Sequence, residues 1–254
     1  MLLVSRILRS FVAMAIIRGT LTFDSLDRLL EDAIPVLFPP VRMSLHLCRL
    51  EQEDAIKLSK RMSSKRFIHE IRREFDGFAA RTHDNWEHRD LYVLDLNCDY
   101  AIPLLRTANE TGMFSAPMKW LLLRDRSSVV GDSRDERETL KDMAVYPDSE
   151  VIVARKRMDG VVEISSVYRP SPFHEAIEED RGNWTIEHGV RMPNLYPSSR
   201  RRRDLRRTPL KSCLVMTDPD TINHLTDYEN KHIDPVTKAN YPWIMHIANR
   251  MNAT

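Results

Sequence analysis

The sequence predicts an α/β fold in which helices cover a parallel sheet. Two apolar segments at 91–96 and 120–123 have the length of strands, and segments with helical periodicity at 100–111 and 132–143 follow them. This alternation is typical of parallel sheets, because two parallel strands need a crossover connection that is usually a helix. The chain has 254 residues, which is enough for one large or two small domains.

Residues 21–170 are predicted to form an amino-terminal α/β domain. Leucines at helical spacing predict a helix over 21–34, capped at Asp24 or Ser25. A clean alternation of apolar and polar residues predicts a strand over 41–47. A helix followed by a strand therefore opens the domain.

The rest of this domain continues the alternation and closes with a hairpin. Residues 51–78 are rich in charge and are predicted to form one long or two short exposed helices. The charged helix over 132–143 is expected to face solvent. Alternating segments at 150–157 and 161–168 flank the turn dipeptide Asp159-Gly160, which predicts a β-hairpin.

A linker over 171–209 and the beginning of a second α/β lobe over 210–254 complete the predicted organisation. The linker contains prolines and a cluster of six arginines within 200–207. The lobe is predicted to open with a strand at 214–217 and to end in an amphipathic helix that starts near Asn240. Because this helix reaches the last residues without a glycine cap, we expect the lobe to be incomplete.

The first 20 residues are basic and apolar, and they fit two descriptions. One is an amphipathic helix with Arg6, Arg9 and Arg18 in solvent. The other is a degenerate signal segment with an uncharged core at 10–17. No run of about 18 apolar residues occurs, so the sequence predicts no helix that crosses a membrane.

The composition is that of a globular protein without a dominant charge. Hydrophobic residues make up 42% of the chain, and 38 basic residues nearly balance 37 acidic residues. This balance points to no nucleic acid, membrane surface or acidic substrate. The motifs of nucleotide-binding loops, zinc proteases, serine hydrolases and dithiol sites are absent from the sequence. We therefore expect a protein that is not an enzyme and that holds no cofactor or metal.

The cysteines are placed for a disulfide. Cys48 and Cys98 each close a predicted strand, and the two strands are expected to be neighbours. Cysteines at the same ends of neighbouring strands lie within the span of a disulfide, so this pair forms either a disulfide or two buried thiols. Cys213 is predicted to be a small core residue on its own strand.

Three Asn-x-Thr sequons, at Asn109, Asn183 and Asn252, are candidate sites of N-glycosylation. A tripeptide this short also arises by chance. Three of them in a chain of this length favour the secretory route.

Three further features are weighed as sites. Asp95 stands at the carboxyl end of a strand, where open α/β sheets bind ligands, but we favour a role as a cap or turn residue. His83 and His88 flank Trp86 in a polar loop that would seat a metal ion, although most such loops are simply solvated. The arginine cluster is similar to a nuclear or nucleic-acid address, but without interleaved aromatic residues a solvated arm or a processing site fits better.

Two blocks of the sequence carry a set of short motifs. Residues 91–123 combine Asp95-Leu-Asn-Cys98 at a strand end with a Gly112-Met-Phe114 turn and the strand led by Trp120. The motifs in residues 200–254 are Asp204-Leu205, His224-Leu225-x-Asp227-Tyr228, His232-Ile233-Asp234, Thr237-Lys238-x-Asn240-Tyr241 and Asn252-Ala253. Together the blocks resemble the amino-terminal region of insect antennal ionotropic receptors. These receptors are variant ionotropic glutamate receptors that detect odorous acids and amines.

The resemblance implies a periplasmic-binding-protein-like amino-terminal domain on the extracellular side of a cell membrane, followed by the first strand and helix of a ligand-binding lobe. Such regions assemble with co-receptor subunits of the family, and a small odorant acid or amine binds only in the full-length receptor. The agonist-contacting residues of the family follow Thr254, so none is carried over. Arg207 departs from the glycine usual in the family, and Pro242 interrupts the expected helix.

The resulting prediction is the extracellular amino-terminal portion of a chemosensory ionotropic receptor, a ligand-gated cation channel subunit that does not conduct ions as this chain alone. Two alternatives from other classes remain. One is a soluble secreted module that binds small ligands at its strand ends. The other is an intracellular regulator that uses the arginine cluster as its address.

Overall fold

The computed structural model describes residues 23–37, 42–74, 90–125, 136–227 and 229–254. The chain divides into two compact units. The first unit runs through Arg169 and includes Glu175–Leu195, and the second contains Pro170–His174 and Tyr196–Thr254.

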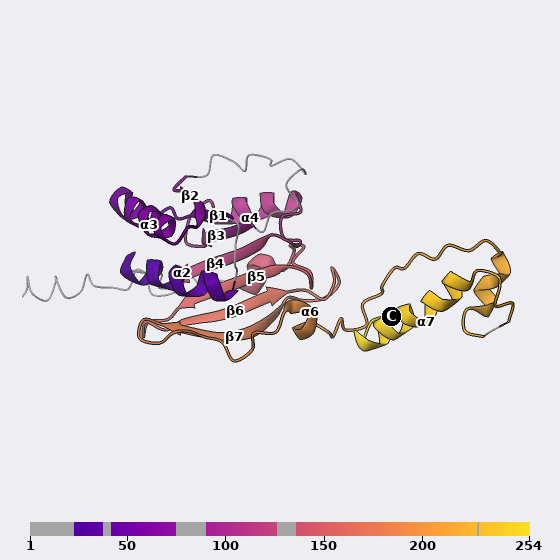
Figure 1. Cartoon of the computed structure of the whole chain (residues 1–254). Helices are drawn as coiled ribbons and strands as arrows, with labels where there is room; N and C mark the ends of the chain where they lie inside the picture. The colour runs from indigo at the N-terminus through magenta and orange to yellow at the C-terminus, as the bar shows by residue number, and fades with distance from the viewer. Residues whose placement is uncertain (1–22, 38–41, 75–89, 126–135, 228) are drawn as a thin grey trace, which may run out of the picture. The chain divides into compact units, whose positions relative to one another are not determined.

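One mixed sheet organises the first unit, with eight strands among the described residues (Figure 1). In chain order they are β1 Arg42–His46, β2 Ile68–Arg72, β3 Asp90–Asp95, β4 Lys119–Asp125, β5 Glu150–Lys156, β6 Val162–Tyr168, β7 Ile177–Thr185 and β8 Gly189–Arg191. Across the sheet the order is β2-β1-β3-β4-β5-β6-β7-β8. Strands β1 to β5 pair in parallel, and β6, β7 and β8 extend the sheet as antiparallel strands. The α/β prediction is confirmed, and the sheet is compatible with a periplasmic-binding-protein-like domain.

Helices cover both faces of this sheet. They are α2 Phe23–Leu37, α3 Gln52–Ser64, α4 Ala101–Glu110 and α5 Glu136–Leu140. Within β3, Leu91 and Val93 belong to one buried cluster, which we call the α2-side core, together with apolar residues of α2 and α3. Tyr92 and Leu94 belong to a second cluster, the α4-side core, with residues of α4 and Leu140 of α5. The central strands β3 and β4 are thus buried on both sides, as is typical of parallel strands.

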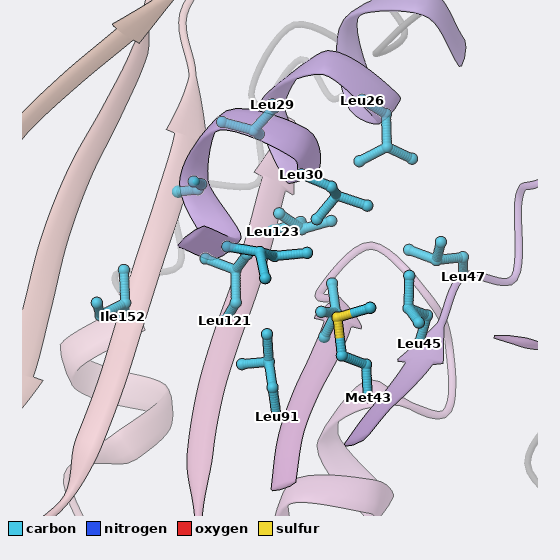
Figure 2. Packing of buried hydrophobic residues seen from close by; sticks show 14 of the residues in the cluster. Leu26, Leu29, Leu30, Met43, Leu45, Leu47, Leu91, Leu121, Leu123 and Ile152 are labelled. Carbon is cyan, nitrogen blue, oxygen red and sulfur yellow. The ribbon is translucent and has the colours of Figure 1, made fainter. Parts of the chain in front are cut away.

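The α2-side core is built from the apolar stripe of α2 and one face of the central strands. Leu29, Leu30 and Ile34 are almost fully buried because they recur at helical spacing on one side of α2. Figure 2 shows the leucines of α2 above the side chains of β1, β3 and β4. The α4-side core has an aromatic centre, in which the ring centroid of Trp120 lies 4.8 Å from that of Tyr92 and 5.2 Å from that of Phe114.

The antiparallel extension corrects the predicted linker over 171–209. Strands β7 and β8 lie inside that range, and β7 pairs with β6 along its length. The sequence of β7, IEEDRGNWT, shows no apolar alternation. The reason is that Trp184 is the one residue of β7 whose side chain belongs to the α2-side core. Gly182 adopts a positive φ of 127°, and a Cβ atom there would collide with the carbonyl of Arg191.

Three other predicted elements differ from the structure. The helix expected over 51–78 ends at Ser64 as α3, and β2 follows as an edge strand; residues 75–78 lie outside the described residues. The helix expected over 132–143 is reduced to α5 among the described residues, and its Glu136 and Leu140 are buried rather than solvent-facing. Helix α2 already includes Asp24 and Ser25, so it begins before both residues predicted to precede it as caps.

The second unit contains α6 Ser198–Arg201, the 3₁₀ helix η2 Pro219–His224 and α7 Pro235–Arg250, and no strand among its described residues. The strand predicted at 214–217 is therefore wrong, and Cys213 is exposed rather than in a core. A second α/β lobe is not shown. Helix α7 starts five residues before Asn240, which puts Pro242 mid-helix, where it removes the hydrogen bond from its own nitrogen to the carbonyl of Lys238. None of the helices in the described residues is long and apolar enough to cross a membrane.

Candidate functional site

The candidate site lies where the winding of the sheet reverses, between β1 and β3. The order β2-β1-β3-β4-β5 is one of the two common orders of doubly wound α/β sheets. In such sheets, ligands bind outside the carboxyl ends of the strands at this switch point. The residues that follow β1 and β3 are therefore the first to consider.

A disulfide occupies this position. Cys48 lies after the end of β1 and Cys98 after the end of β3, and their sulfur atoms are bonded with the Cα atoms 5.8 Å apart. The amide of Cys48 also donates a hydrogen bond to Sγ of Cys98 at 3.2 Å. Cys98 is buried in the α4-side core. The disulfide therefore ties together the two strands between which a ligand of an open sheet would bind.

Asp95 acts as a turn residue beside the disulfide. Its Oδ1 accepts hydrogen bonds from the backbone amide and the side-chain Nδ2 of Asn97, both at 2.9 Å. Its Oδ2 lies 3.9 Å from Nε of Arg49. Burial, and then the charge of Asp95, raise the pKa of the Tyr100 hydroxyl to about 12, so this hydroxyl stays protonated at neutral pH. The role of turn residue favoured from the sequence is what the geometry shows.

The disulfide also determines whether Cys48, Asp95 and Cys98 can bind a metal ion. The ligand atoms of Cys48, Asp95 and Cys98 lie within 4.8 Å of one another, close enough to surround an ion. Metals bind cysteine as the thiolate, however, and both sulfur atoms are used by the disulfide. With the disulfide formed, the cluster lacks the ligands of a metal site.

A buried charge network lies at the carboxyl ends of β4 and β5. Arg155 is only 6% exposed, and its Nε donates to Oε2 of Glu136 at 2.7 Å. One of its terminal nitrogens donates to Glu178 of β7 and to the hydroxyl of Ser165. Nε of Arg124 lies 3.9 Å from Glu136. The network therefore ties α5, the last parallel strand and the antiparallel extension together.

The network changes the ionisation of Glu178. Burial alone would raise the pKa of this carboxyl, but hydrogen bonds from Arg155 and Ser165 outweigh burial and lower the pKa below its usual range. Glu178 is consequently ionised at neutral pH, and Arg155 is held between two carboxylates.

In the second unit, Asp234 binds the loop that precedes η2 and one residue of η2 itself. Its carboxylate accepts hydrogen bonds from the amide and hydroxyl of Thr217, the amide of Asp218 and the hydroxyl of Thr221. These bonds, those of Thr217 first, hold the pKa of Asp234 well below its usual range. Asp234 stands directly before α7 with a positive φ of 48°. This set of hydrogen bonds around Asp234, which we call the Asp234 hub, gives a structural role to the His232-Ile233-Asp234 motif.

His224 is surrounded by acidic residues at the end of η2. Its Nδ1 lies 2.8 Å from Asp227 and 3.3 Å from Glu229, and its Nε2 lies 3.5 Å from Asp220. The hydrogen bond to Asp227, and then the surrounding negative charge, raise the pKa of His224. His224, Asp227 and Glu229 are close enough to hold a metal ion, but the two acids are exposed, as is common for surface groups that bind none.

The three sequons lie on different elements of the structure. Asn109 lies in the last turn of α4 beside a pocket of about 390 Å³ between α4 and α5. Asn183 lies on β7, and Asn252 follows α7 in the second unit. His83 and His88 lie outside the described residues.

Part of the arginine cluster is packed within the second unit. The guanidinium carbon of Arg200 lies 4.7 Å from the ring centroid of Tyr196, and Nε of Arg201 donates to the carbonyl of Tyr196 at 2.8 Å. Arg202 is buried. Arg202 therefore differs from the solvated arm expected from the sequence, whereas Arg203, Arg206 and Arg207 are exposed as such an arm would be.

Sequence reasoning misses the charge network and the Asp234 hub. A usable pattern existed for Arg155, because it follows Val151 and Val153 at a spacing of two and so shares their buried face. No comparable pattern existed for Asp234, whose partners lie 13 to 17 residues earlier, in the loop before η2 and in η2 itself.

Comparison with known proteins adds one finding. A family model described as "Ionotropic receptor 75a N-terminal" matches residues 87–215, just over half of the chain. The match begins before β3 and includes every later strand of the sheet and the start of the second unit. No curated protein and no solved structure matches the chain.

Proposed function

Because the chain belongs to the ionotropic receptor 75a N-terminal family, we propose that it forms the extracellular amino-terminal region of a chemosensory ionotropic receptor, a ligand-gated cation channel. In this role the region contributes to assembly with co-receptor subunits of the same family. A small odorant acid or amine is a ligand of the full-length receptor, and this region has no catalytic function. The family match over 87–215 carries the proposal.

The disulfide supports extracellular placement. Disulfides persist in the secretory route and at cell surfaces, whereas the cytosol keeps thiols reduced. The bonded pair Cys48–Cys98 joins the carboxyl ends of β1 and β3, which are neighbouring inner strands of the sheet. This arrangement counts against the intracellular regulator.

The switch point supports a role in assembly over small-ligand binding. The polar groups at the ends of β1 and β3 are engaged with one another, as Asp95 binds Asn97 and lies near Arg49. A ligand there would have to displace those contacts beside a covalent link. We therefore assign the first unit to the architecture and assembly of the receptor.

A protease-protection experiment tests the placement. The chain with a carboxyl-terminal epitope tag is expressed in insect cells, and sealed microsomes are treated with protease with and without detergent. We expect the tag and an unreduced Cys48–Cys98 pair to survive without detergent. A tag that is digested in intact microsomes, with both thiols reduced, would refute extracellular placement.

Co-precipitation tests the assembly role. The tagged chain is co-expressed with membrane subunits of the same receptor family and recovered under non-reducing conditions. The double variant C48S/C98S should recover less of the subunit, because the link between β1 and β3 is lost. C213S is the matched control, since it removes an exposed thiol and leaves the disulfide intact. No recovery of any family subunit by the unaltered chain would count against assembly.

A further inference from the structure

The side chains of the three sequons differ in how far they are engaged by the fold. Asn109 is half-buried, and its Oδ1 accepts a hydrogen bond from the amide of Ala144 at 2.7 Å. It also lines the pocket between α4 and α5 together with Glu138 and Lys141. A glycan on Asn109 would have to leave through this groove between two helices.

Asn252 is exposed, but its Nδ2, the atom to which a glycan would be attached, is engaged in a hydrogen bond. Its Nδ2 donates to Oδ1 of Asp204 at 2.8 Å. Its backbone has a positive φ of 46°, and its carbonyl accepts from the amide of Arg207 at 2.7 Å. Asn252 is thus held in a defined contact between the end of the described chain and residues 204–207.

Asn183 has neither restriction. It lies on β7, which pairs with β6 on one side and β8 on the other, so its backbone is held in a regular ladder. Trp184 next to it points into the α2-side core, and strand alternation turns Asn183 to the opposite face. Asn183 is exposed, and its side chain makes no hydrogen bond or ion pair within the described residues.

The surroundings of Asn183 are polar and open. Its partners in register are Glu163 on β6 and Arg191 on β8, which share its face of the sheet. Arg191 is exposed, and the side chain of Glu163 is 46% exposed. A large hydrophilic group attached here would displace no apolar contact.

We propose that Asn183 is the N-glycosylated asparagine of this chain, ahead of Asn109 and Asn252. The amide nitrogen Nδ2 forms a bond to the anomeric carbon of an oligosaccharide carried on a lipid diphosphate. The nitrogen loses one proton, and the lipid diphosphate leaves. Thr185 supplies the hydroxyl that the Asn-x-Thr sequon requires. The proposal rests on the proposed function, because glycosylation of this kind needs entry into the secretory route.

The experiment separates the site from the route. The chain is expressed in insect cells in two forms, one with its own first residues and one behind a cleavable heterologous signal sequence. Both carry a carboxyl-terminal reporter sequon, whose glycosylation reports entry into the secretory route. Digestion with an N-glycosidase followed by intact-mass measurement counts the glycans on each form.

In the form with the heterologous signal, we expect N183Q to remove one glycan and T185A to do the same. T185S, which keeps the hydroxyl, should retain it, and N109Q and N252Q should leave the mass shift unchanged. A glycosylated reporter with an N183Q variant that keeps the full shift would overturn the proposed site. If Asn183 is glycosylated only behind the heterologous signal, the site stands and the extracellular placement of the native chain fails.

Discussion

Trp184 on β7 donates a hydrogen bond from its indole nitrogen to Oδ2 of Asp32 on α2, at 2.8 Å and across 152 residues of sequence. The ring itself is 1% exposed in the α2-side core. A Cβ atom added to Gly189 on β8 would come within 3.4 Å of the same carboxylate oxygen. Helix α2 therefore holds the antiparallel extension through one aromatic residue, Trp184, and one carboxylate, Asp32.

We expect replacement of Trp184 to loosen this extension. W184F keeps an aromatic ring and loses the donor, which should cost about 1–2 kcal/mol of unfolding free energy. W184A also opens a cavity in the core and should cost about 3–5 kcal/mol. Hydrogen exchange of β7 and β8 amides locates the effect, and urea unfolding followed by circular dichroism measures its size.

W243F is the matched control for this prediction. Trp243 on α7 is 69% exposed, so its replacement should change neither measurement. Equal losses in W184F and W243F would show that the buried indole has no special role.

The central part of the fold could be predicted because its strands are apolar on both faces. The segment LYVLDL in β3 shows this in the sequence alone, and the turn Asp159-Gly160 separately indicates the hairpin of β5 and β6. Strands β2 and β7 could not be predicted in the same way. Each lies where half of its side chains face solvent or ionic partners, so charged sequences such as IHEIR and IEEDRGNWT look like helix or linker.

The candidate site was predictable to the same extent. The cysteines could be placed together because each follows a strand whose neighbour was predictable. The Glu178 partner of Arg155 depends on the register of β7, and its Glu136 partner depends on how α5 packs against the sheet. The sequence indicates neither, so neither carboxylate could be assigned to Arg155. The Asp234 hub depends on the left-handed backbone of Asp234 itself, and no glycine in the sequence indicates that conformation.

Removal of the disulfide should destabilise the first unit. The two cysteines are 50 residues apart. A cross-link over a loop of this length lowers the conformational entropy of the unfolded chain, which in the chain-entropy treatment adds roughly 4 kcal/mol to the free energy of unfolding. We expect C48S/C98S to unfold at a lower urea concentration than the unaltered chain. The unaltered chain treated with dithiothreitol should show the same decrease, because its disulfide is reduced. Non-reducing peptide mass spectrometry should show the linked peptides of Cys48 and Cys98.

C213S should unfold at the same urea concentration as the unaltered chain, because Cys213 is an exposed thiol. Unreacted Cys48 and Cys98 thiols in protein recovered from the secretory route would contradict the disulfide itself.

Loss of Arg155 should be severe, because it removes the hydrogen-bonded partner of the buried Glu136 carboxylate and leaves only Arg124, at 3.9 Å, beside that charge. Glu136 is 2% exposed and accepts from Arg155 at 2.7 Å, so R155A strands a carboxylate in the interior at a cost of about 3–5 kcal/mol. R157A is the matched control, since the side chain of Arg157 is 55% exposed and its pairs are at the surface. Thermal unfolding at neutral pH should distinguish the two variants, and equal melting temperatures would refute the network.

The same network predicts a dependence on acid. The pKa of Glu178 is lower in the folded protein than its unfolded value near 4.3. Glu178 therefore contributes stability that is present above about pH 4 and is lost as the pH falls through its folded value. E178Q should flatten this part of the profile of melting temperature against pH. An acid limb of the same slope in E178Q would assign the dependence to other carboxyls.

The last prediction concerns Asp234, whose carboxylate at the start of α7 holds the loop residues Thr217 and Asp218 and also Thr221 of η2. The substitution D234N keeps the shape but replaces one carboxylate oxygen by an amide donor, which faces donors that it does not satisfy. We expect faster hydrogen exchange at the amides of Thr217 and Asp218, with β3 and β4 unchanged. Because the pKa of Asp234 is lowered in the folded protein, acid should release the same loop in the unaltered chain as the carboxylate is protonated. E229Q is the control, since Glu229 is 71% exposed in the same unit. Unchanged protection of the Thr217 and Asp218 amides in D234N would show that Asp234 does not hold this loop.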